Sequence, residues 1–371
     1  MRLIHISDTH LGFSAYSKLD PAEGINQREM DVYRAFSQAV DVAIQLKPDF
    51  VVHSGDLFDT VRPQNRAIDF ALKQLIRLSE AGLETILISG NHSTPRLRET
   101  GSIFRIFEHL PHIRPIHEPG ITQLVVGDTT VQAIPHSVTP NLAELASKAR
   151  ARGDSKHNVL VLHAGVLGAD VFKMDEFNEQ TVPQESLADG WDYVALGHFH
   201  SFRKIPPNAY YAGSTERMGF GEAGQEKGVV EVDLESHKVQ FHPLKVRDML
   251  DLDPLDATGS ASSEILREAR ERLSAIAIDD KIVRLVIRNV AQDALRSLDI
   301  PAIRRLGSSA LHFELKVDRV ESEDEQSAAG DAQIGLLADE FKKYVSTLDY
   351  TDDKKSRLVE LAIPYLQRDE E

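Results

Sequence analysis

Hydrophobic residues follow two alternating patterns along the N-terminal part of the chain. Continuous apolar runs at 3–7, 49–54 and 83–89 predict buried β-strands. Between these runs, apolar residues recur every three or four positions over 27–46 and 64–81, a spacing typical of amphipathic helices, and Pro48 and Gly82 mark the helix ends. The β-α-β-α-β order predicts an α/β fold, with a largely buried sheet and helices on both of its faces.

The same alternation continues, less regularly, to about residue 250. Helices are expected at 102–110 and 141–152, and strands at 123–126, 130–134, 158–162 and 191–196. Two further strands, at 228–233 and 238–244, alternate apolar and polar residues, and we expect them to form a closing antiparallel edge. We therefore assign residues 1–250 to one large domain.

The residues beyond 250 predict two smaller parts joined by a linker. A helix near 264–277 and strands near 282–287 and 311–317 suggest a small α/β domain over 251–320. Residues 321–332 form a polar, acidic linker, and 333–371 show two apolar helical faces separated by a turn. A pair of short helices cannot bury both faces on itself, so we expect this segment to dock, either on its own chain or on a partner.

Composition limits the class of protein and the kind of metal site. The chain has 371 residues, a formal net charge of -16 and no cysteine. No apolar run reaches the roughly 18 residues that a transmembrane helix needs, and the N-terminus leads directly into a strand, which indicates a soluble, cytoplasmic protein with no membrane contact. Without thiolates, any metal ion must be held by oxygen and imidazole ligands. The acidic net charge argues against binding of nucleic acid through the overall charge of the protein. It does not exclude a local basic patch near the ligand motifs.

Several strand-like runs end in residue types that bind metal ions. The endings are Asp8-Thr9-His10, Ser54-Gly55-Asp56, Gly90-Asn91-His92, His163-Ala164-Gly165 and Gly197-His198-Phe199-His200. In open α/β sheets, ligands bind in the crevice outside the carboxyl ends of the strands, so we expect these endings to converge. Asp56 is expected at the middle of the site.

The side chains at these endings can hold two divalent ions. The candidate ligands are Asp8, His10, Asp56, Asn91, His163, His198 and His200. Asp56 has two carboxylate oxygens and can bridge ions about 3.5–4 Å apart. Two divalent ions outweigh the charges of two aspartates, so the loaded site attracts a phosphate and lowers the pKa of a bridging water. Imidazole, carboxylate and amide ligands suit manganese, iron or zinc better than magnesium.

The ordered set of motifs Asp-x-His, Gly-Asp-x-x-Asp, Gly-Asn-His, His-Ala-Gly and Gly-His-x-His resembles that of the calcineurin-like metallophosphoesterase superfamily. Within it, the chain is similar to the SbcD family, the nuclease subunit of SbcCD and MR-type complexes that repair DNA breaks. The stretches that carry this likeness are Asp8-Thr9-His10-Leu11-Gly12, Gly55-Asp56-Leu57-Phe58-Asp59 and Gly197-His198-Phe199-His200. The ligand motifs cover residues 8–200. Beyond residue 200, the resemblance rests only on the expected order of a small domain followed by a terminal helix pair.

The resemblance implies a four-layer α/β/β/α sandwich for residues 1–250 and a DNA-contacting capping domain for 251–320. It also implies a C-terminal helix pair, within 333–371, that binds the coiled-coil base of an SbcC-type SMC-like ATPase, and a homodimer. Two residues depart from the family pattern: Ser93 stands where Asp or Glu is common, and Asp59 stands where some members carry histidine. Neither departure removes a ligand; both bear on the rate and on the preferred end-processing mode.

These observations favour a nuclease that uses two divalent ions, most simply Mn²⁺, and acts on DNA ends, hairpins and single strands. We expect double-strand exonuclease and single-strand or hairpin endonuclease activity in double-strand-break repair, with His92 as a catalytic residue that positions the phosphate or protonates the leaving oxygen. One alternative is hydrolysis of cyclic nucleotides or phosphoproteins, against which the residues beyond 250 argue. The other is a mainly scaffolding subunit, against which the complete ligand set argues.

Overall fold

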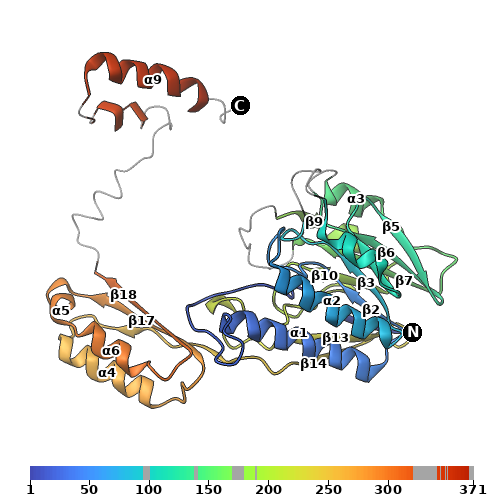
Figure 1. Ribbon diagram of the computed structural model, residues 1–371, viewed down its shortest axis with the longest axis horizontal. Coiled ribbons are helices and arrows are strands. Elements are labelled where there is room, and N and C mark those ends of the chain that lie inside the picture. The colour runs from blue at the N-terminus through green and yellow to red at the C-terminus, as the bar shows by residue number, and fades with distance from the viewer. Residues whose placement is uncertain are drawn as a thin grey trace. The chain divides into compact units, whose positions relative to one another are not determined.

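The computed structural model describes residues 1–94, 101–137, 141–168, 179–188, 190–320 and 341–366, without 343, 347 and 349 (Figure 1). The chain divides into two compact units. The first comprises Met1–Leu255, Leu266–Val286 and Asp299–Lys316, and the second comprises Asp256–Ile265, Ile287–Leu298 and Val317–Glu371. Within the described residues, no helix combines the length and the apolar character needed to cross a bilayer.

The first sheet has six strands in the order β14-β13-β1-β2-β3-β4. They are β1 (Arg2–Ile6), β2 (Phe50–His53), β3 (Glu84–Ile88), β4 (Ile113–Ile116), β13 (Gly228–Asp233) and β14 (Lys238–Pro243). Strands β1 to β4 are parallel neighbours, and β13 and β14 add the predicted antiparallel edge. The sequence pattern does not predict β4, because Pro115 interrupts it; proline cannot donate to the ladder and is tolerated on an edge strand, which is the position of β4.

Helices α1 (Gln27–Leu46) and α2 (Asn65–Glu80) and the 3₁₀-helix η2 (Ile103–His109) confirm the helices predicted from the apolar spacing. The side chain of Asn26 caps α1 by accepting hydrogen bonds from backbone N–H groups of its first turn. The helix ends at Lys47, which adopts a left-handed conformation with φ of 49° directly before Pro48. Local signals therefore define both ends of this helix.

The expectation of helices on both faces of the first sheet is wrong. Strands β1, β2 and β3 are adjacent in sequence order. Connections between such parallel strands are right-handed, so their helices fall on the same side of the sheet. Accordingly, residues of α1 and α2 such as Phe36 and Leu75 share one buried cluster with Ile4 and Val51. The other face of the sheet packs against a second sheet.

The second sheet has six strands in the order β11-β12-β10-β7-β6-β5. They are β5 (Thr122–Val126), β6 (Thr129–Ile134), β7 (His157–His163), β10 (Tyr193–Gly197), β11 (Arg203–Ile205) and β12 (Ala209–Tyr211). Helix α3 (Leu142–Lys148) and the 3₁₀-helix η3 (Gln184–Leu187) cover its outer face and bury Trp191. Separate from it are the two-stranded ribbon of β8 (Gly165–Leu167) and β9 (Thr181–Pro183) and the 3₁₀-helix η4 (Phe220–Glu222).

The two sheets pack face to face and complete the sandwich. The buried cluster between them joins Phe50 and Ile86 of the first sheet to Val159 and Ala195 of the second. Together with the helix-covered outer faces, this interface gives the order helix, sheet, sheet, helix (Figure 1). The predicted four-layer α/β/β/α architecture is confirmed.

The remaining strands form a separate four-stranded sheet. They are β15 (Met249–Asp251), β16 (Leu255–Asp256), β17 (Ile282–Val290) and β18 (His312–Arg319), and the accompanying helices are α4 (Ser262–Ser274), α5 (Gln292–Ser297) and α6 (Ile300–Leu306). Helix α9 (Asp352–Leu366) lies near the C-terminus. The domain boundaries at 250, 320 and 332 stay predictions, because the linker at 321–332 and most of the first C-terminal helix lie outside the described residues.

Candidate active site

Every residue predicted for the site lies at or just beyond the carboxyl end of a strand. The first sheet supplies Asp8 and His10 after β1, Asp56 after β2, and Asn91 and His92 after β3. The second sheet supplies His163 at the end of β7 and His198 and His200 after β10. Main-chain hydrogen bonds join the first two loops, from the Asp8 N–H to the Gly55 carbonyl at 3.1 Å and from the His10 N–H to the Asp56 carbonyl at 3.0 Å. Both sheets thus contribute to one cluster of side chains.

Several of these residues adopt backbone conformations that are rare outside glycine. The φ angle is 48° at Asp8, 46° at His10, 51° at Asp56 and 101° at His198. Such conformations cost about 1–3 kcal/mol each and persist only where the surrounding structure fixes them. Residues of this kind cluster at active sites and ligand clamps, so their concentration at one edge of the sandwich supports a functional site there.

Two glycines allow the loops of the two sheets to approach each other. Gly55 has a φ of 112°, and a Cβ atom at this position would collide with the imidazole of His163. At Gly197, a Cβ atom would collide with the carbonyl oxygen of Ser54 and the hydroxyl of Ser7. The absence of these Cβ atoms lets side chains from β2, β7 and β10 meet.

Asp8, His10 and His200 form the first group of converging side chains, with one potential ligand atom from each within 4.8 Å of the others. His10 Nδ1 donates to the Asp59 carboxylate at 3.2 Å, and His200 Nδ1 donates to the Glu222 carboxylate at 2.8 Å. Both Nε2 atoms therefore direct lone pairs inward, and they lie only 3.1 Å apart. Two facing lone pairs beside a buried carboxylate fit a shared cation.

Asp8, Asp56 and His163 form a second group with ligand atoms within 4.8 Å of one another, and Asn91 contacts the same histidine. His163 Nδ1 donates to the Ser54 carbonyl oxygen at 2.9 Å. His163 Nε2 then faces two acceptors, Asn91 Oδ1 at 2.8 Å and Asp56 Oδ2 at 3.1 Å. Burial opposes protonation of this imidazole, but the Asp56 carboxylate raises the pKa of His163 to about 9. A proton or a metal ion at His163 Nε2 can satisfy the two facing oxygen atoms, so protons and metal ions compete for this nitrogen.

The two aspartates are buried and held by donors. Asp8 accepts hydrogen bonds from the Ser7 hydroxyl at 2.5 Å and the His198 N–H at 3.1 Å, and Asp56 accepts one from the His92 N–H at 3.0 Å. Burial raises the pKa of Asp8 above its ordinary value. Burial acts in the same direction on Asp56, but the charge and hydrogen bond of His163 outweigh it, so the pKa of Asp56 lies well below its usual range. Asp56 therefore keeps its negative charge at the centre of the site.

His198 lies beside both groups. Its ring centroid is 5.5 Å from that of His163, and its Nε2 lies 3.3 Å from Glu179 Oε1. A carboxylate next to the outer nitrogen of a histidine fixes the orientation of the ring and raises its basicity.

His92 occupies the rim of the site. Its ring is half-buried and makes an edge-on contact with His10, with centroids 4.9 Å apart. His92 Nδ1 donates to the main-chain carbonyl oxygen of Asp59 at 2.8 Å. The loop that carries Asp59 thus holds two histidines, one through its carboxylate and one through its backbone.

Sequence reasoning missed the carboxylates that support the histidines. Glu179 follows the undescribed residues 169–178, and Glu222 belongs to η4 and pairs with the buried Lys227. Burial acts to raise the pKa of Glu222, but the hydrogen bond from His200 and the Lys227 ammonium hold it down to about 2. No periodicity or motif marks these residues, because their partners lie far away in the sequence or in irregular loops.

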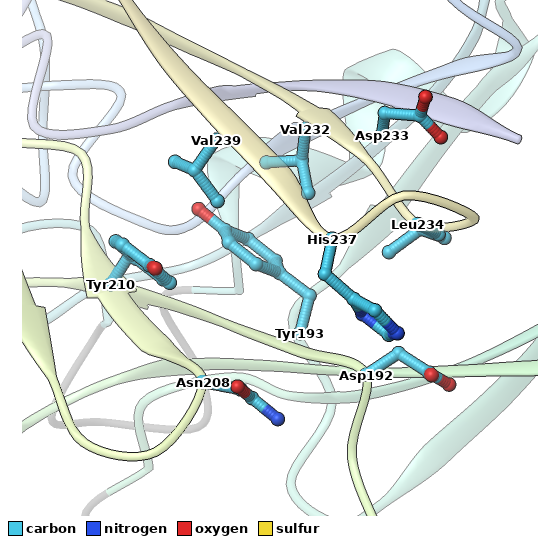
Figure 2. A pocket seen from close by; sticks show the side chains of 9 residues that line it. All are labelled: Asp192, Tyr193, Asn208, Tyr210, Val232, Asp233, Leu234, His237 and Val239. Carbon is cyan, nitrogen blue, oxygen red and sulfur yellow. The ribbon is translucent and has the colours of Figure 1, made fainter.

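A small cavity at the other end of β10 is unrelated to this site. It is lined by residues such as Asp192 and Tyr193 at the amino end of β10, Asn208 before β12 and His237 in the β13–β14 turn (Figure 2). Its volume is about 20 Å³, enough for roughly one water molecule. The carboxyl end of β10, by contrast, carries His198 and His200.

Comparisons with known proteins agree with the motifs. The chain is similar to the DNA double-strand break repair protein Mre11 of Sulfurisphaera tokodaii, at 35% identity over 205 residues, which are 54% of this chain and 49% of that protein. It is also similar to the Mre11 proteins of Sulfolobus acidocaldarius, at 24% identity over 97% of this chain and 94% of that protein, and of Thermoplasma acidophilum, at 28% over 75% and 73%. The chain thus spans about half the length of the first of these relatives.

Residues 1–225 match the family described as calcineurin-like phosphoesterase. The matched region contains both sheets' ligand-bearing loops, from Asp8 to His200. It covers more than half of the 371 residues. The resemblance predicted from the motifs is therefore confirmed, and the chain belongs to the calcineurin-like phosphoesterase family.

Proposed function

We propose that this protein is a manganese-dependent nuclease that hydrolyses DNA phosphodiester bonds during the repair of double-strand breaks. The family is one of phosphoesterases, and the similar archaeal proteins are named for double-strand break repair. The observation that carries the proposal is the meeting of buried acceptors at the carboxyl ends of both sheets, where His10 and His200 point lone pairs at each other and His163 faces Asn91 and Asp56.

In this proposal, seven residues hold two divalent ions. Asp8, His10 and His200 would hold one ion. His163, its contacts Asn91 and Asp56, and the neighbouring His198 would hold the other. When bound, such a pair of ions supplies a nucleophile at neutral pH and neutralises charge on the phosphate. The mixed imidazole, carboxylate and amide set suits Mn²⁺.

His92 acts as the catalytic acid in this scheme. Its Nδ1 hydrogen-bonds the Asp59 carbonyl oxygen, which fixes the ring at the edge of the site. His92 stabilises and then protonates the leaving 3′-oxygen, an effect typically worth about 10² to 10⁴ in rate. Its half-buried ring beside His10 suits a group that meets the substrate at the edge of the ions.

The proposed substrates are DNA ends, hairpins and single strands. Residues 251–320 would contact the DNA, two copies of the chain would form a homodimer, and the C-terminal helix pair would bind an SMC-like ATPase of the SbcC type.

The proposal is tested by incubating the purified protein and Mn²⁺ with labelled duplex DNA, hairpin DNA, single-stranded DNA and a chromogenic phosphodiester. We expect cleavage of all the DNA substrates and its loss on addition of EDTA. Turnover of the chromogenic ester without DNA cleavage would instead support a cyclic-nucleotide or phosphoprotein hydrolase. No turnover of any substrate, in a protein that binds the ATPase, would support a scaffold.

A further inference from the structure

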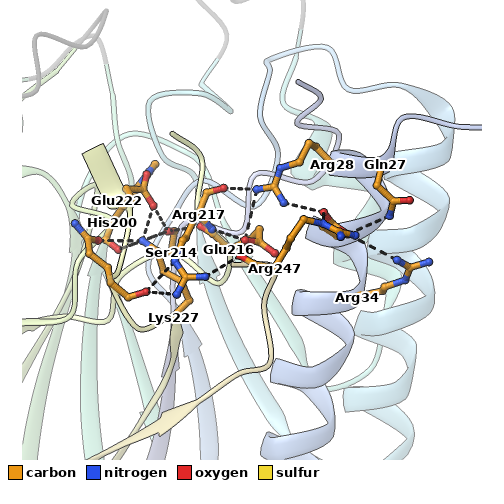
Figure 3. A network of polar contacts seen from close by, with 12 residues as sticks. Gln27, Arg28, Arg34, His200, Ser214, Glu216, Arg217, Glu222, Lys227 and Arg247 are labelled. Carbon is orange, nitrogen blue, oxygen red and sulfur yellow. Dashed lines mark hydrogen bonds and ion pairs between the residues drawn. The ribbon is translucent and has the colours of Figure 1, made fainter. Parts of the chain in front are cut away.

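A buried ion pair lies against the outer side of His200 (Figure 3). Glu222 Oε1 accepts a hydrogen bond from His200 Nδ1 at 2.8 Å, and Lys227 Nζ pairs with Glu222 Oε2 at 2.5 Å. The side chain of Lys227 is 0% exposed and that of Glu222 is 13% exposed. Neither residue is among the proposed metal ligands.

Lys227 also holds the main chain of the same histidine. Its ammonium donates to the His200 carbonyl oxygen at 2.7 Å and to the Ser214 hydroxyl at 2.9 Å. Glu222 and the Gln225 side-chain oxygen, at 3.3 Å, complete the acceptors around the ammonium. The ring of His200 is thus fixed through Glu222, and its backbone is fixed through Lys227.

Stability alone gives a weak reason for this arrangement. Lysine and glutamate are almost never fully buried unless they are paired, and replacing a buried ion pair with well-packed apolar residues is often neutral or stabilising. The ring of His200 places its Nε2 3.1 Å from His10 Nε2. Holding this ring in a defined orientation is therefore a better explanation for the buried ion pair beside it.

Each of the other histidines of the site has its own support, which is a main-chain carbonyl for His163 and separate carboxylates for His10 and His198. His163 Nδ1 is held by the main-chain carbonyl of Ser54, and His10 Nδ1 is held by Asp59, whose side chain is 27% exposed. Glu222 is therefore a more deeply buried side-chain support than Asp59. A substitution at Glu222 should act on one of the two ion positions and spare the other.

We propose that Glu222, held by Lys227, is a positioning residue that fixes the ring of His200 and thereby sets the affinity of the ion bound by Asp8, His10 and His200. The inference rests on the proposed two-ion function. It concerns the metal affinity of one position, so it can be measured without any nuclease assay.

The test is Mn²⁺ titration calorimetry, with electron paramagnetic resonance of the loaded protein, on wild type, Glu222→Ala and Glu222→Gln. Wild type should bind two ions and show the spectrum of a spin-coupled pair. Glu222→Ala should weaken one ion by about 10- to 100-fold, the usual effect of removing such a support, and leave the other unchanged. With one equivalent of Mn²⁺, Glu222→Ala should show the spectrum of a single Mn²⁺ ion that is not spin-coupled to another. Glu222→Gln preserves the side-chain volume and one acceptor oxygen, so its loss of Mn²⁺ affinity should be smaller than that of Glu222→Ala.

Glu226→Ala is the matched control, because Glu226 is an exposed carboxylate next to Lys227 in the chain. It should bind both ions as wild type does. Unchanged affinity for both ions in both Glu222 variants would overturn the positioning role. Equal loss of affinity for both ions would also overturn it, because a general loss of structure affects both ion positions alike. If wild type itself bound no Mn²⁺, the proposed function would fail first.

Discussion

Asp56 stands at the point where ligands from the two sheets meet. Its Oδ1 accepts the His92 N–H, while its Oδ2 faces His163 Nε2. Both oxygens thus lie among residues that approach from different strands, as a bridging carboxylate requires. The shared position makes Asp56 the residue whose loss should affect both ions.

Asp56→Asn should therefore reduce metal occupancy as well as activity. The amide retains one oxygen but loses the charge that offsets two cations, so we expect fewer than two Mn²⁺ per chain after desalting, together with loss of cleavage. Elemental analysis measures the occupancy. Two retained ions in the variant would contradict a bridging role.

His92→Ala should separate chemistry from metal binding. Because His92 donates through its backbone to Asp56 and through its ring to Asp59, truncating the side chain leaves the Asp56 contact in place. We expect two bound Mn²⁺ and unchanged DNA affinity, with hydrolysis lower by about 10² to 10⁴.

Titration calorimetry and single-turnover cleavage on one preparation of this variant distinguish the possibilities. Cleavage near the wild-type rate would mean that His92 only packs the loop. Loss of an ion together with activity would mean that it is a ligand or supports one.

At the level of residues, the sequence was sufficient for the candidate ligands but not for their supports. Ligand types such as Asp8 and His163 follow predictable strands, so their convergence could be expected from topology. In the sequence, Asp59 stood out only because some members of the family carry histidine at this position. The structure shows that it contacts His10. Glu222 lies in an irregular segment, and nothing local indicates that it meets His200.

At the level of elements, helix α1 carries a buried ionic cluster on the side facing the segment after β14. Asp31 accepts hydrogen bonds from Arg28 at 2.8 Å and from Arg247 at 2.7 and 2.9 Å. Arg28 in turn pairs with Glu216 at 3.4 Å (Figure 3). Burial acts to raise the pKa of Asp31, but the hydrogen bonds and charges of the two arginines hold it below its ordinary value.

Asp31→Ala should destabilise the large unit by roughly 1.5–3 kcal/mol, because it removes the buried carboxylate that two arginines share, while Glu216 and Asp280 still pair with them. Urea unfolding in EDTA measures the change. The control is Asp41→Ala on the same helix, where the exposed pair with Arg77 should contribute less than about 1 kcal/mol.

The pH dependence of this contribution has a defined sign. A carboxylate with a depressed pKa stabilises the fold above its unfolded-state pKa of about 3.9, and this stabilisation is lost as the pH falls through the folded value. The stability difference between wild type and Asp31→Ala should therefore be largest near neutral pH and shrink below about pH 4. A difference that grows in acid would contradict the assignment.

The long, periodic elements of the sandwich were predictable and the short ones were not. Helices α1 and α2 combine regular apolar spacing with clear end signals. Strands β11 and β12 have three residues each, too few to establish a period. The hydrophobic pattern predicted the helices on the first sheet, whereas the sheet on its other face was predicted only through the family resemblance, because local patterns do not encode sheet-to-sheet packing.

At the level of the whole molecule, the C-terminal part is expected to act separately from the site. All the proposed ligands lie between Asp8 and His200, whereas α9 begins at Asp352. Truncation after Ser327 should therefore leave Mn²⁺-dependent cleavage nearly intact and abolish co-purification with the SMC-like ATPase. Tight binding of that partner by the truncated chain would show that the docking segment lies elsewhere.

The division of the ligands between two sheets has a consequence for synthesis. The strands that carry Asp8, Asp56 and Asn91 emerge from the ribosome early, but His198 and His200 follow β10, and the first sheet gains its antiparallel edge only with β13 and β14. A nascent chain that stops before residue 198 holds Asp8, Asp56 and His163 but lacks His198 and His200. If the proposed function holds, products truncated before His198 would not cleave DNA, because the last ligands to be translated complete the site.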